Sequence, residues 1–286
     1  MTGEKASPLP DSLEIIRPRE RLREPRVALF DFDGTLSLIR QGWQDVMIPM
    51  MVEVLAATPR AEPRAEIESV VRRFVTDLTG RQTVYQMIRL AEEVTKRGGA
   101  PREPLDYKRE YLRQLDVEIA GRVRGIETGA MKPDRFLLPG AREVLEEFSR
   151  RGVALYCASG TDEPYARHEA DLLGLSPFFV GGVRGAIDDY RSFSKQIVIR
   201  GLIAECGLVG EELVVAGDGF VEIEEGRAVD AFTVGVASDE QALLSGSGAE
   251  ADPWKRSRLV AAGADVIIPD FRGAAQLVDW LFGGCP

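Results

Sequence analysis

Short apolar runs recur along the chain, separated by segments long enough for crossover helices. The first is Val27 to Phe30, and the others occupy residues 153–158, 213–216, 232–236 and 266–268. Continuous apolar runs of this length are typical of strands that are buried on both faces of a parallel sheet. The alternation of such strands with helix-length segments predicts an α/β protein with a doubly wound, mostly parallel sheet.

The long interval between the first two runs has a different pattern. Across residues 37–138 the apolar side chains recur at helical spacing, as in Val46, Met50 and Val54, and no short β-branched run interrupts them. This interval holds 17 Lys and Arg against 15 Asp and Glu, whereas residues 139–286 hold 13 against 24. We therefore expect three parts, which are an N-terminal arm (1–25), a core domain (26–36 and 139–286) and a helical cap domain inserted after the first strand (37–138).

Two further segments have weak patterns. The arm carries prolines and alternating charge around one apolar patch at Leu13, Ile15 and Ile16, so we expect it to be loosely attached. Residues 238–253 are rich in Ser, Gly, Ala and acidic side chains, and we expect them to form a surface loop.

Charge and hydropathy exclude two classes of partner. The chain has 46 Asp and Glu against 36 Lys and Arg, and the net charge of −10 is the wrong sign for neutralising nucleic-acid phosphates. No run approaches the ~20 apolar residues that cross a bilayer, and the N-terminal segment holds Pro, Arg and Glu where a signal peptide places an apolar stretch. We expect a cytoplasmic protein that binds neither nucleic acid nor a membrane.

Cysteine and histidine are too scarce for most metal and redox chemistry. The three cysteines, Cys157, Cys206 and Cys285, are widely spaced without a C-x-x-C pair, so they encode neither a disulfide framework nor a zinc site. The single histidine, His168, cannot build a histidine metal cage. Carboxylate, hydroxyl and lysine side chains are left to carry the chemistry.

Two aspartates, Asp31 and Asp33, follow the first apolar run directly. In open α/β sheets ligands bind at the carboxyl ends of the strands, so this position predicts a functional edge. A plain Asp-Gly turn would also explain the pattern. A calcium loop would not, because Leu36 stands at its required glycine position and Gly42 at its required glutamate position.

Two weaker candidates follow later runs. Ser159 ends the run at 153–158 and is followed by Gly160 and a predicted helix start near Asp162. Free backbone N–H groups at a helix start can hold a phosphoryl oxygen, but a serine there is also a common helix cap. Lys195 precedes another predicted helix and, taken alone, is typical of a solvated surface lysine.

A second pair of acids, Asp218 and Glu222, follows the run at 213–216. Gly217 and Gly219 could belong to a dinucleotide-binding loop, but Glu222 occupies the third glycine position of that motif. The two carboxylates are better explained as ligands, or supports for ligands, of a hard cation such as Mg²⁺.

Taken in order, these segments resemble the four motifs of the haloacid dehalogenase (HAD) superfamily. The resemblance rests on Asp31-Phe-Asp33-Gly-Thr, Ser159, Lys195 and Gly217-Asp218-x-x-x-Glu222, and it spans residues 27–236. It implies a Rossmann-like core and a C1-type helical cap that closes over the active site. Gly219 and Glu222 stand where many members have Ser and Asp.

The resemblance also implies the type of reaction. Asp33 fills the place of the acid/base aspartate of phosphatases and phosphomutases, which dehalogenases lack. We therefore expect a phosphatase that hydrolyses a small phosphorylated metabolite, such as a sugar phosphate or a phosphoglycolate-like ester, with Asp31 as the nucleophile that forms an aspartyl phosphate. A phosphomutase that uses the same residues and an inactive scaffold that only binds a ligand are the alternatives.

The remaining site residues are implied in the same way. Mg²⁺ would be held by Asp31, Asp218 and the Asp33 main-chain carbonyl, with Glu222 acting through water. The phosphate would be held by a set of groups that follow two later strands, namely Ser159, Gly160 and Lys195.

Substrate contacts are expected from the cap. Gly80 breaks two helical patterns, and in C1-capped relatives a glycine-containing turn between cap helices points at the active site. This places Arg81 and Gln82 near the substrate, and Trp43 beside the hinge is a further candidate. Arg81 would suit a second anionic group or the phosphate itself, although it could also be a solvated residue. No feature of the sequence specifies an oligomeric state.

Overall fold

The computed structural model describes residues 13–19, 23–246 and 250–283. Its sheet has seven strands in the order β1-β7-β6-β5-β2-β3-β4, and all neighbouring pairs are parallel except β1 with β7. The α/β prediction is therefore confirmed. In chain order the strands β1 to β7 are Glu14–Ile15, Val27–Phe30, Ala154–Asp162, Phe179–Ala186, Leu213–Gly217, Phe232–Val236 and Val266–Ile268.

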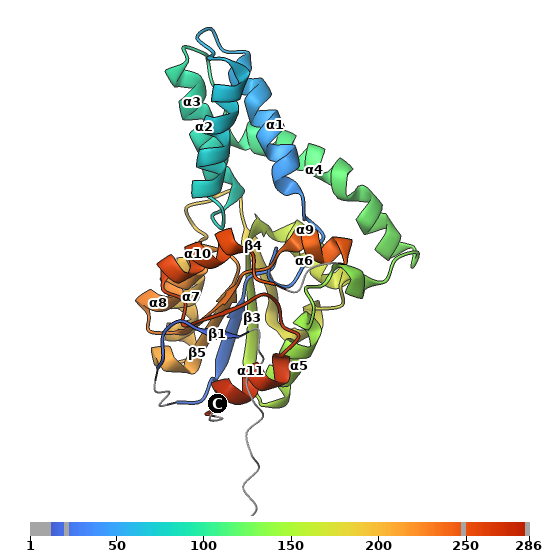
Figure 1. Cartoon of the computed structure of the whole chain (residues 1–286), viewed down its shortest axis with the longest axis vertical. Helices are drawn as coiled ribbons and strands as arrows, with labels where there is room; N and C mark the ends of the chain where they lie inside the picture. The colour runs from blue at the N-terminus through green and yellow to red at the C-terminus, as the bar shows by residue number, and fades with distance from the viewer. Residues whose placement is uncertain (1–12, 20–22, 247–249, 284–286) are drawn as a thin grey trace, which may run out of the picture.

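Helices form two groups (Figure 1). Those that accompany the sheet are α5 Ala141–Arg150, α6 Glu163–Leu172, α7 Lys195–Glu205, α8 Phe220–Ala228, α9 Glu240–Ser245, α10 Pro253–Ala262 and α11 Ala274–Leu281, with short 3₁₀ turns at Pro133–Phe136, Ser176–Phe178 and Gly210–Glu212. Those that stand above the sheet are α1 Trp43–Ala56, α2 Arg64–Asp77, α3 Thr83–Lys96 and α4 Pro104–Glu127. The second group lies entirely between β2 and β3 in the sequence.

The connections into and out of this helical cap lie side by side. Ser37 forms a bridge with Leu137, the Leu38 amide donates to Phe136 O at 2.8 Å, and the Leu138 amide donates to Leu36 O at 3.0 Å. Two adjacent connections of this kind suit a hinge at the expected boundary, and the cap limits at residues 37 and 138 remain our proposal.

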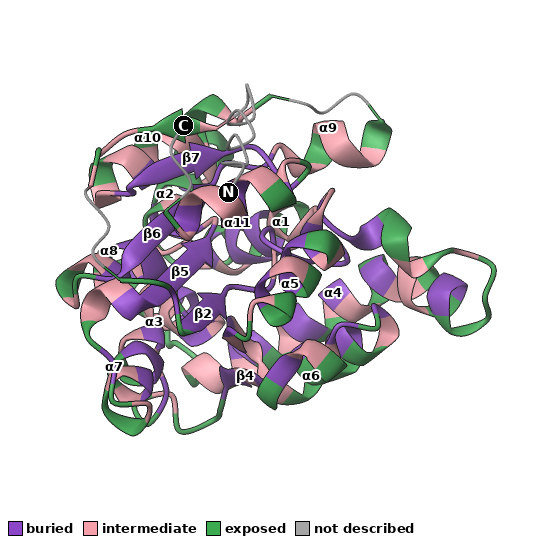
Figure 2. Ribbon diagram, turned by 90° about the horizontal axis from the view of Figure 1, so that it is seen from below, coloured by how far each residue is buried: buried purple, intermediate pink, exposed green. Residues whose placement is uncertain are grey.

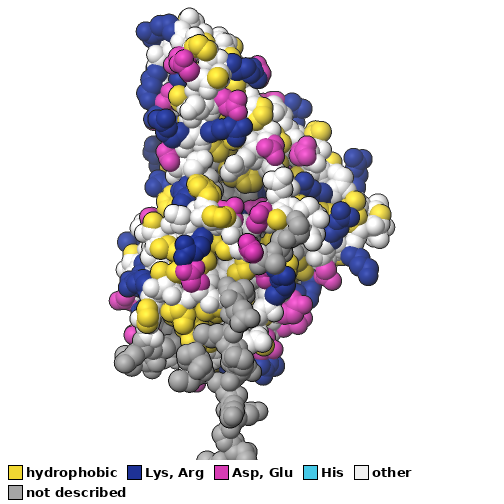
Figure 3. Space-filling view, in the orientation of Figure 1, with side chains coloured by type: hydrophobic (Ala, Val, Ile, Leu, Met, Phe, Trp, Pro, Cys, Tyr) yellow, Lys and Arg dark blue, Asp and Glu magenta, His cyan; other side chains and the backbone are white. Residues whose placement is uncertain are grey.

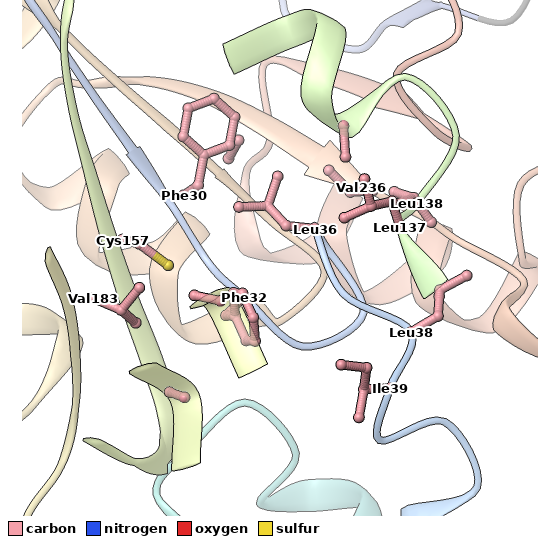
Figure 4. Close-up of a cluster of buried hydrophobic side chains, with 14 of the residues drawn as sticks. Phe30, Phe32, Leu36, Leu38, Ile39, Leu137, Leu138, Cys157, Val183 and Val236 are labelled. Carbon is pink, nitrogen blue, oxygen red and sulfur yellow. The ribbon is translucent and has the colours of Figure 1, made fainter. Parts of the chain in front are cut away.

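The central strands are buried on both faces. Every residue of β2, β5 and β6 is buried, and Figure 2 shows these strands inside layers of helices whose outer faces are exposed. Apolar residues continue beyond β2, where Phe32 points into a cluster with Phe30, Leu36 and Cys157 (Figure 4). Since burial of these side chains fixes the loop, it also fixes the acidic residues on either side of Phe32.

Two strands escaped the sequence prediction. β4 contains Gly181 and Gly182, both with φ above 70°, so it has no continuous apolar run. β1 is only two residues long and pairs antiparallel with β7. The amides of Ile16 and Arg17 also donate to Asp265 O at 2.9 and 3.0 Å, so this part of the arm is attached to the sheet, while residues 1–12 and 20–22 of the expected arm lie outside the described residues.

The expectation of a surface loop over 238–253 was wrong in part. Residues 240–245 form the helix α9, because the Asp239 side chain accepts a hydrogen bond from the Ala242 amide at 2.9 Å and caps its first turn. The Asp252 side chain caps α10 in the same way, through the Lys255 amide at 2.7 Å. These two caps place the side chains of Glu240 and Lys255 beside the predicted site.

Candidate active site

The acidic residues predicted as a site converge at the carboxyl ends of the central strands. The register pairs Phe30 of β2 with Ala216 of β5, so Asp31 and Asp218 follow at the same edge. Gly34 lies between them with a φ of 74°, and a Cβ at this position would be 2.3 Å from Asp218 Oδ2. Glycine is therefore required for both the turn and the close approach of Asp218.

Lys195 is buried between two of these carboxylates. Its Nζ lies 2.8 Å from Asp31 Oδ1 and 2.8 Å from Glu222 Oε2, and only 6% of the residue is exposed. The helix that begins at Lys195 is capped by Ser194, whose hydroxyl accepts from the Ile197 amide at 3.1 Å. Lys195 is thus a fixed internal cation and not the solvated lysine that its sequence context alone would allow.

Burial and charge act against each other in this pair. Burial raises the pKa of Asp31 well above its usual range, although Lys195 opposes the shift. Burial also disfavours the charge of Lys195, but the carboxylates of Asp31 and Glu222 outweigh it and raise its pKa. The Lys195 ammonium is therefore charged across the physiological pH range. Without this cation beside it, Asp31 would not ionise readily.

The carboxylates of Asp31, Asp218 and Glu222 fit a hard cation. They offer oxygen atoms that lie within 4.8 Å of one another, and oxygen ligands are what Mg²⁺ prefers. Among the described residues no donor contacts Asp31 Oδ2 or Asp218 Oδ1, so each of these aspartates has an oxygen left for an ion. Both oxygens of Glu222 are occupied, by Lys195 and by the Gly219 amide at 2.8 Å.

A second, partly buried lysine, which the sequence analysis missed, contacts the other oxygen of Asp218. Lys255 Nζ lies 2.7 Å from Asp218 Oδ2, 2.7 Å from Glu240 Oε1 and 3.0 Å from the Ser238 hydroxyl. Burial raises the pKa of Glu240, and Lys255 opposes this shift. Lys255 thus pairs with Asp218 and Glu240, while Lys195 pairs with Asp31 and Glu222.

The serine predicted to bind phosphate contacts the proposed acid, Asp33. The Ser159 hydroxyl, which is fully buried, donates to Asp33 Oδ2 at 3.0 Å and accepts from the Thr161 amide at 3.0 Å. Gly160 lines the cavity next to it. Ser159 thereby orients the Asp33 carboxylate, and only Gly160 of this pair opens toward a ligand.

Asp33 also has a cationic neighbour from the linker that enters the cap. Arg40 Nε lies 3.9 Å from Asp33 Oδ1 and donates to Glu169 Oε1 at 2.9 Å. Burial raises the pKa of Glu169 to about 7, in spite of the opposing charge of Arg40. No sequence motif predicts the contact between Arg40 and Glu169. Glu169 lies inside α6, and the spacing of Arg40 from the first motif is not typical of any site.

The three cap residues named from the sequence occupy different places. Trp43 and Arg81 line the cavity. Gln82 is buried, and its Nε2 donates to Phe193 O at 2.6 Å and to Tyr190 O at 3.0 Å. Gln82 therefore connects the cap to the segment that precedes Lys195.

A cavity of about 110 Å³ lies between the cap and the core. Figure 3 shows a hollow between these parts, with acidic side chains along its lower border. The core contributes a set of charged residues, namely Asp31, Asp33, Lys195, Asp218 and Glu240. The cap and its linker contribute mostly neutral or apolar residues and two arginines, namely Arg40, Trp43, Met47, Arg81, Gln86 and Tyr111.

The fold and this cavity define an α/β enzyme with a carboxylate and lysine centre beneath a helical cap. The sequence model of the haloacid dehalogenase-like hydrolases matches residues 25–230, and the chain belongs to this family. No match was found among curated proteins. None of the helices in the described ranges is long and apolar enough to span a membrane.

Solved structures share the fold over most of the chain. A predicted phosphoglycolate phosphatase from Haemophilus somnus 129PT is 16% identical, with a TM-score of 0.57 over 90% of this chain and 99% of that one. A predicted phosphatase from Clostridium acetobutylicum is 15% identical, with a TM-score of 0.57 and coverage of 90% and 99%. A β-phosphoglucomutase from Clostridium difficile is 14% identical, with a TM-score of 0.53 and coverage of 83% and 98%.

Proposed function

We propose that the protein is a Mg²⁺-dependent phosphatase that hydrolyses a small phosphorylated metabolite through an aspartyl phosphate on Asp31. The observation that carries this proposal is the position of Lys195 Nζ, 2.8 Å from Asp31 Oδ1 at the edge where Asp218 also lies. A buried cation beside a carboxylate nucleophile offsets its repulsion of a phosphate dianion. The family and the cavity beneath the cap support the same conclusion.

The reaction would proceed in two displacements. Asp31 attacks phosphorus, and the new O–P bond forms as the bond to the ester oxygen breaks, while Asp33 gives a proton to the departing oxygen. Asp33 then takes a proton from the water that attacks the aspartyl phosphate, which releases inorganic phosphate and restores Asp31. The Ser159 hydroxyl orients Asp33 for both proton transfers.

Phosphate oxygens would be held by Lys195 and by the backbone at Gly160, both of which line the cavity. Ser159 contacts the phosphate only when its hydroxyl leaves Asp33. Mg²⁺ would be held by Asp31, Asp218 and the Asp33 main-chain carbonyl, and when bound it supplies positive charge to the phosphoryl oxygens. Glu222 supports this arrangement through Lys195 or through water, because both its oxygens are already occupied.

The test is a screen for inorganic phosphate release from sugar phosphates, phosphoglycolate, nucleotides and para-nitrophenyl phosphate. Release should cease after exhaustive chelation and return with Mg²⁺ but poorly with Ca²⁺, because Ca²⁺ accepts more and looser ligands than in-line transfer requires. Full activity after chelation would contradict the metal requirement. An isomerised phosphate ester without phosphate release would identify a phosphomutase instead.

A further inference from the structure

Besides Ser37, whose hydroxyl accepts from the Ile39 amide, three buried polar side chains line the cavity but have no part in the proposed phosphoryl transfer. They are Arg40 in the linker, Gln86 on α3 and Tyr111 on α4. Each residue is 5% exposed or less. Buried polar groups are normally hydrogen-bonded within the protein, so their remaining capacity indicates what a ligand would have to supply.

Tyr111 has the largest unmet capacity. Its hydroxyl forms no hydrogen bond with any other part of the described structure, although the residue is only 3% exposed and lines the cavity. Burial raises the pKa of Tyr111, and Arg40 and Asp33 are the charged groups that act on it. The hydroxyl is therefore neutral, close to the proposed acid, and free to donate to or accept from a ligand.

Gln86 is similar. Its Nε2 makes one long hydrogen bond of 3.5 Å to Val75 O, and no donor among the described residues contacts its Oε1. The amide thus offers an acceptor, and little of its donor capacity is used. Trp43 and Met47 supply apolar surface to the same cavity.

Arg40 is the one of the three with a charge, and that charge is compensated. Glu169 Oε1 lies 2.7 Å from its Nη2, and Asp33 Oδ1 lies 3.9 Å from its Nε. An anionic group placed beside Arg40 would compete with two carboxyl groups, of Glu169 and Asp33, that already face the guanidinium. This part of the cavity therefore favours an uncharged group that forms hydrogen bonds.

We infer that Tyr111, Gln86 and the compensated Arg40 form a subsite for the leaving group, and that the substrate is the phosphate ester of a small, uncharged, hydroxyl-bearing alcohol. The Tyr111 and Gln86 side chains would hydrogen-bond its hydroxyl groups, with Trp43 and Met47 against its carbon atoms. This inference rests on the proposed function. An ester with a carboxylate next to the phosphate, bound through Arg81 at the exposed border, is the alternative that the experiment must separate from it.

The experiment compares two esters of nearly equal size, 2-hydroxyethyl phosphate and 2-phosphoglycolate, and adds erythritol 4-phosphate as a longer polyol ester. For the wild-type protein we expect kcat/KM to be at least about ten-fold higher for the two hydroxylated esters. In Tyr111→Phe this preference over phosphoglycolate should fall by about ten-fold, because only the hydroxyl is removed. Gln86→Leu should act in the same direction and serves as the second variant if Tyr111→Phe does not fold.

Tyr107→Phe is the matched control. Tyr107 lies one turn earlier on α4, is equally buried, and its hydroxyl accepts from the Arg102 amide at 3.1 Å without lining the cavity. Its substitution should leave the ratio between the esters unchanged. An equal loss of preference in both variants, or a wild-type preference for phosphoglycolate, would overturn the inference.

Calorimetric binding of the same three esters to Asp31→Asn separates this inference from the proposed function. Binding of the hydroxylated esters, weakened about ten-fold when Tyr111→Phe is added, would support the subsite even if the wild-type protein releases no phosphate. In that case the proposed function alone would fail. Equal affinity for hydroxylated and carboxylated esters in this background would reject the subsite, whatever the turnover.

Discussion

The floor of the cavity, built by the core, and its roof, built by the cap, differ in how their polar side chains are paired. On the floor, Lys195 contacts Asp31 and Glu222, and Lys255 contacts Asp218 and Glu240, all within 2.8 Å. On the roof, Tyr111 and Gln86 are buried but make at most one long hydrogen bond within the described chain. The two lysines of the floor are paired with carboxylates without a ligand, whereas Tyr111 and Gln86 of the roof have little or no pairing inside the described part of the protein.

This difference suggests that the floor carries the reaction and that the roof determines which substrates bind. Charged groups that are held in place before the substrate binds stabilise a developing charge without further reorganisation. Polar groups without an internal partner instead raise the affinity for a ligand that hydrogen-bonds to them and lower it for a ligand that does not. Substitutions on the floor should therefore affect every substrate, and substitutions on the roof should change the ranking of substrates.

The largest effect is expected from Asp31→Asn on the floor. The substitution keeps the side-chain volume but removes the proposed nucleophile, so kcat for phosphate release should fall by roughly 10⁴-fold or more, about 5.5 kcal/mol of barrier. The loss should be similar for all esters that the protein hydrolyses. Retention of a tenth of the wild-type rate would contradict the assignment of Asp31.

Lys255→Met tests whether the second lysine prepares Asp218 for the ion. With Lys255 removed, Asp218 and the partly buried Glu240 both lose their ammonium partner. We expect affinity for Mg²⁺, measured by calorimetry, to fall about 10- to 100-fold, as is usual when a group that orients a metal ligand is lost. Lys132→Met, at an exposed lysine, is the control. Equal Mg²⁺ affinities in the two variants would show that Lys255 does not prepare Asp218 for the ion.

Arg81→Ala tests the border of the roof. If the exposed guanidinium contacts the substrate, kcat/KM for the preferred ester should fall by about ten-fold relative to para-nitrophenyl phosphate, because solvent weakens such a contact. Equal losses on both esters would indicate impaired closure of the cap. An unchanged ratio and unchanged rates would leave Arg81 as a surface residue.

The smallest effect concerns the Glu169–Arg40 pair. The pKa of Glu169 is raised from 4.5 to about 7, so between these values the folded state binds more protons than the unfolded state, and the free energy of unfolding falls as pH rises. Between about pH 6.5 and 8 this contribution is on the order of 1 kcal/mol. Denaturant unfolding should show that the free energy of unfolding falls with pH in the wild-type protein and not in Glu169→Gln. The same pH dependence in both proteins would contradict the raised pKa of Glu169.

Much of the floor could be predicted from the sequence because its acids follow buried strands directly. Parallel register carries Asp31 and Asp218 to one edge, so their proximity follows from the apolar runs that precede them. Lys255 could not be found in this way. It reaches Asp218 only after the chain has passed through β6 and α9, and a single lysine on a helix has no pattern that distinguishes it from a solvated one.

The residues of the roof could not be predicted from the sequence for a different reason. Tyr107, Tyr111 and Leu115 recur every four residues on α4, which is the spacing of an ordinary buried helix face. Only the three-dimensional packing shows that the hydroxyl of Tyr111 has no partner while that of Tyr107 has one. Strand β4 was missed because its glycines interrupt the apolar pattern on which the strand prediction depends.

The antiparallel pairing of β1 has a consequence for solubility. Without residues 13–19, β7 would become the edge of the sheet and present the backbone of Val266–Ile268, three buried apolar residues, as a template for another chain. Two residues of β1 are enough to cover it, and Glu14, paired with Arg256, puts a charge on the new edge. Strand β1 thus blocks edge-to-edge pairing through β7, and a chain lacking residues 13–19 should self-associate even where its candidate active site is intact.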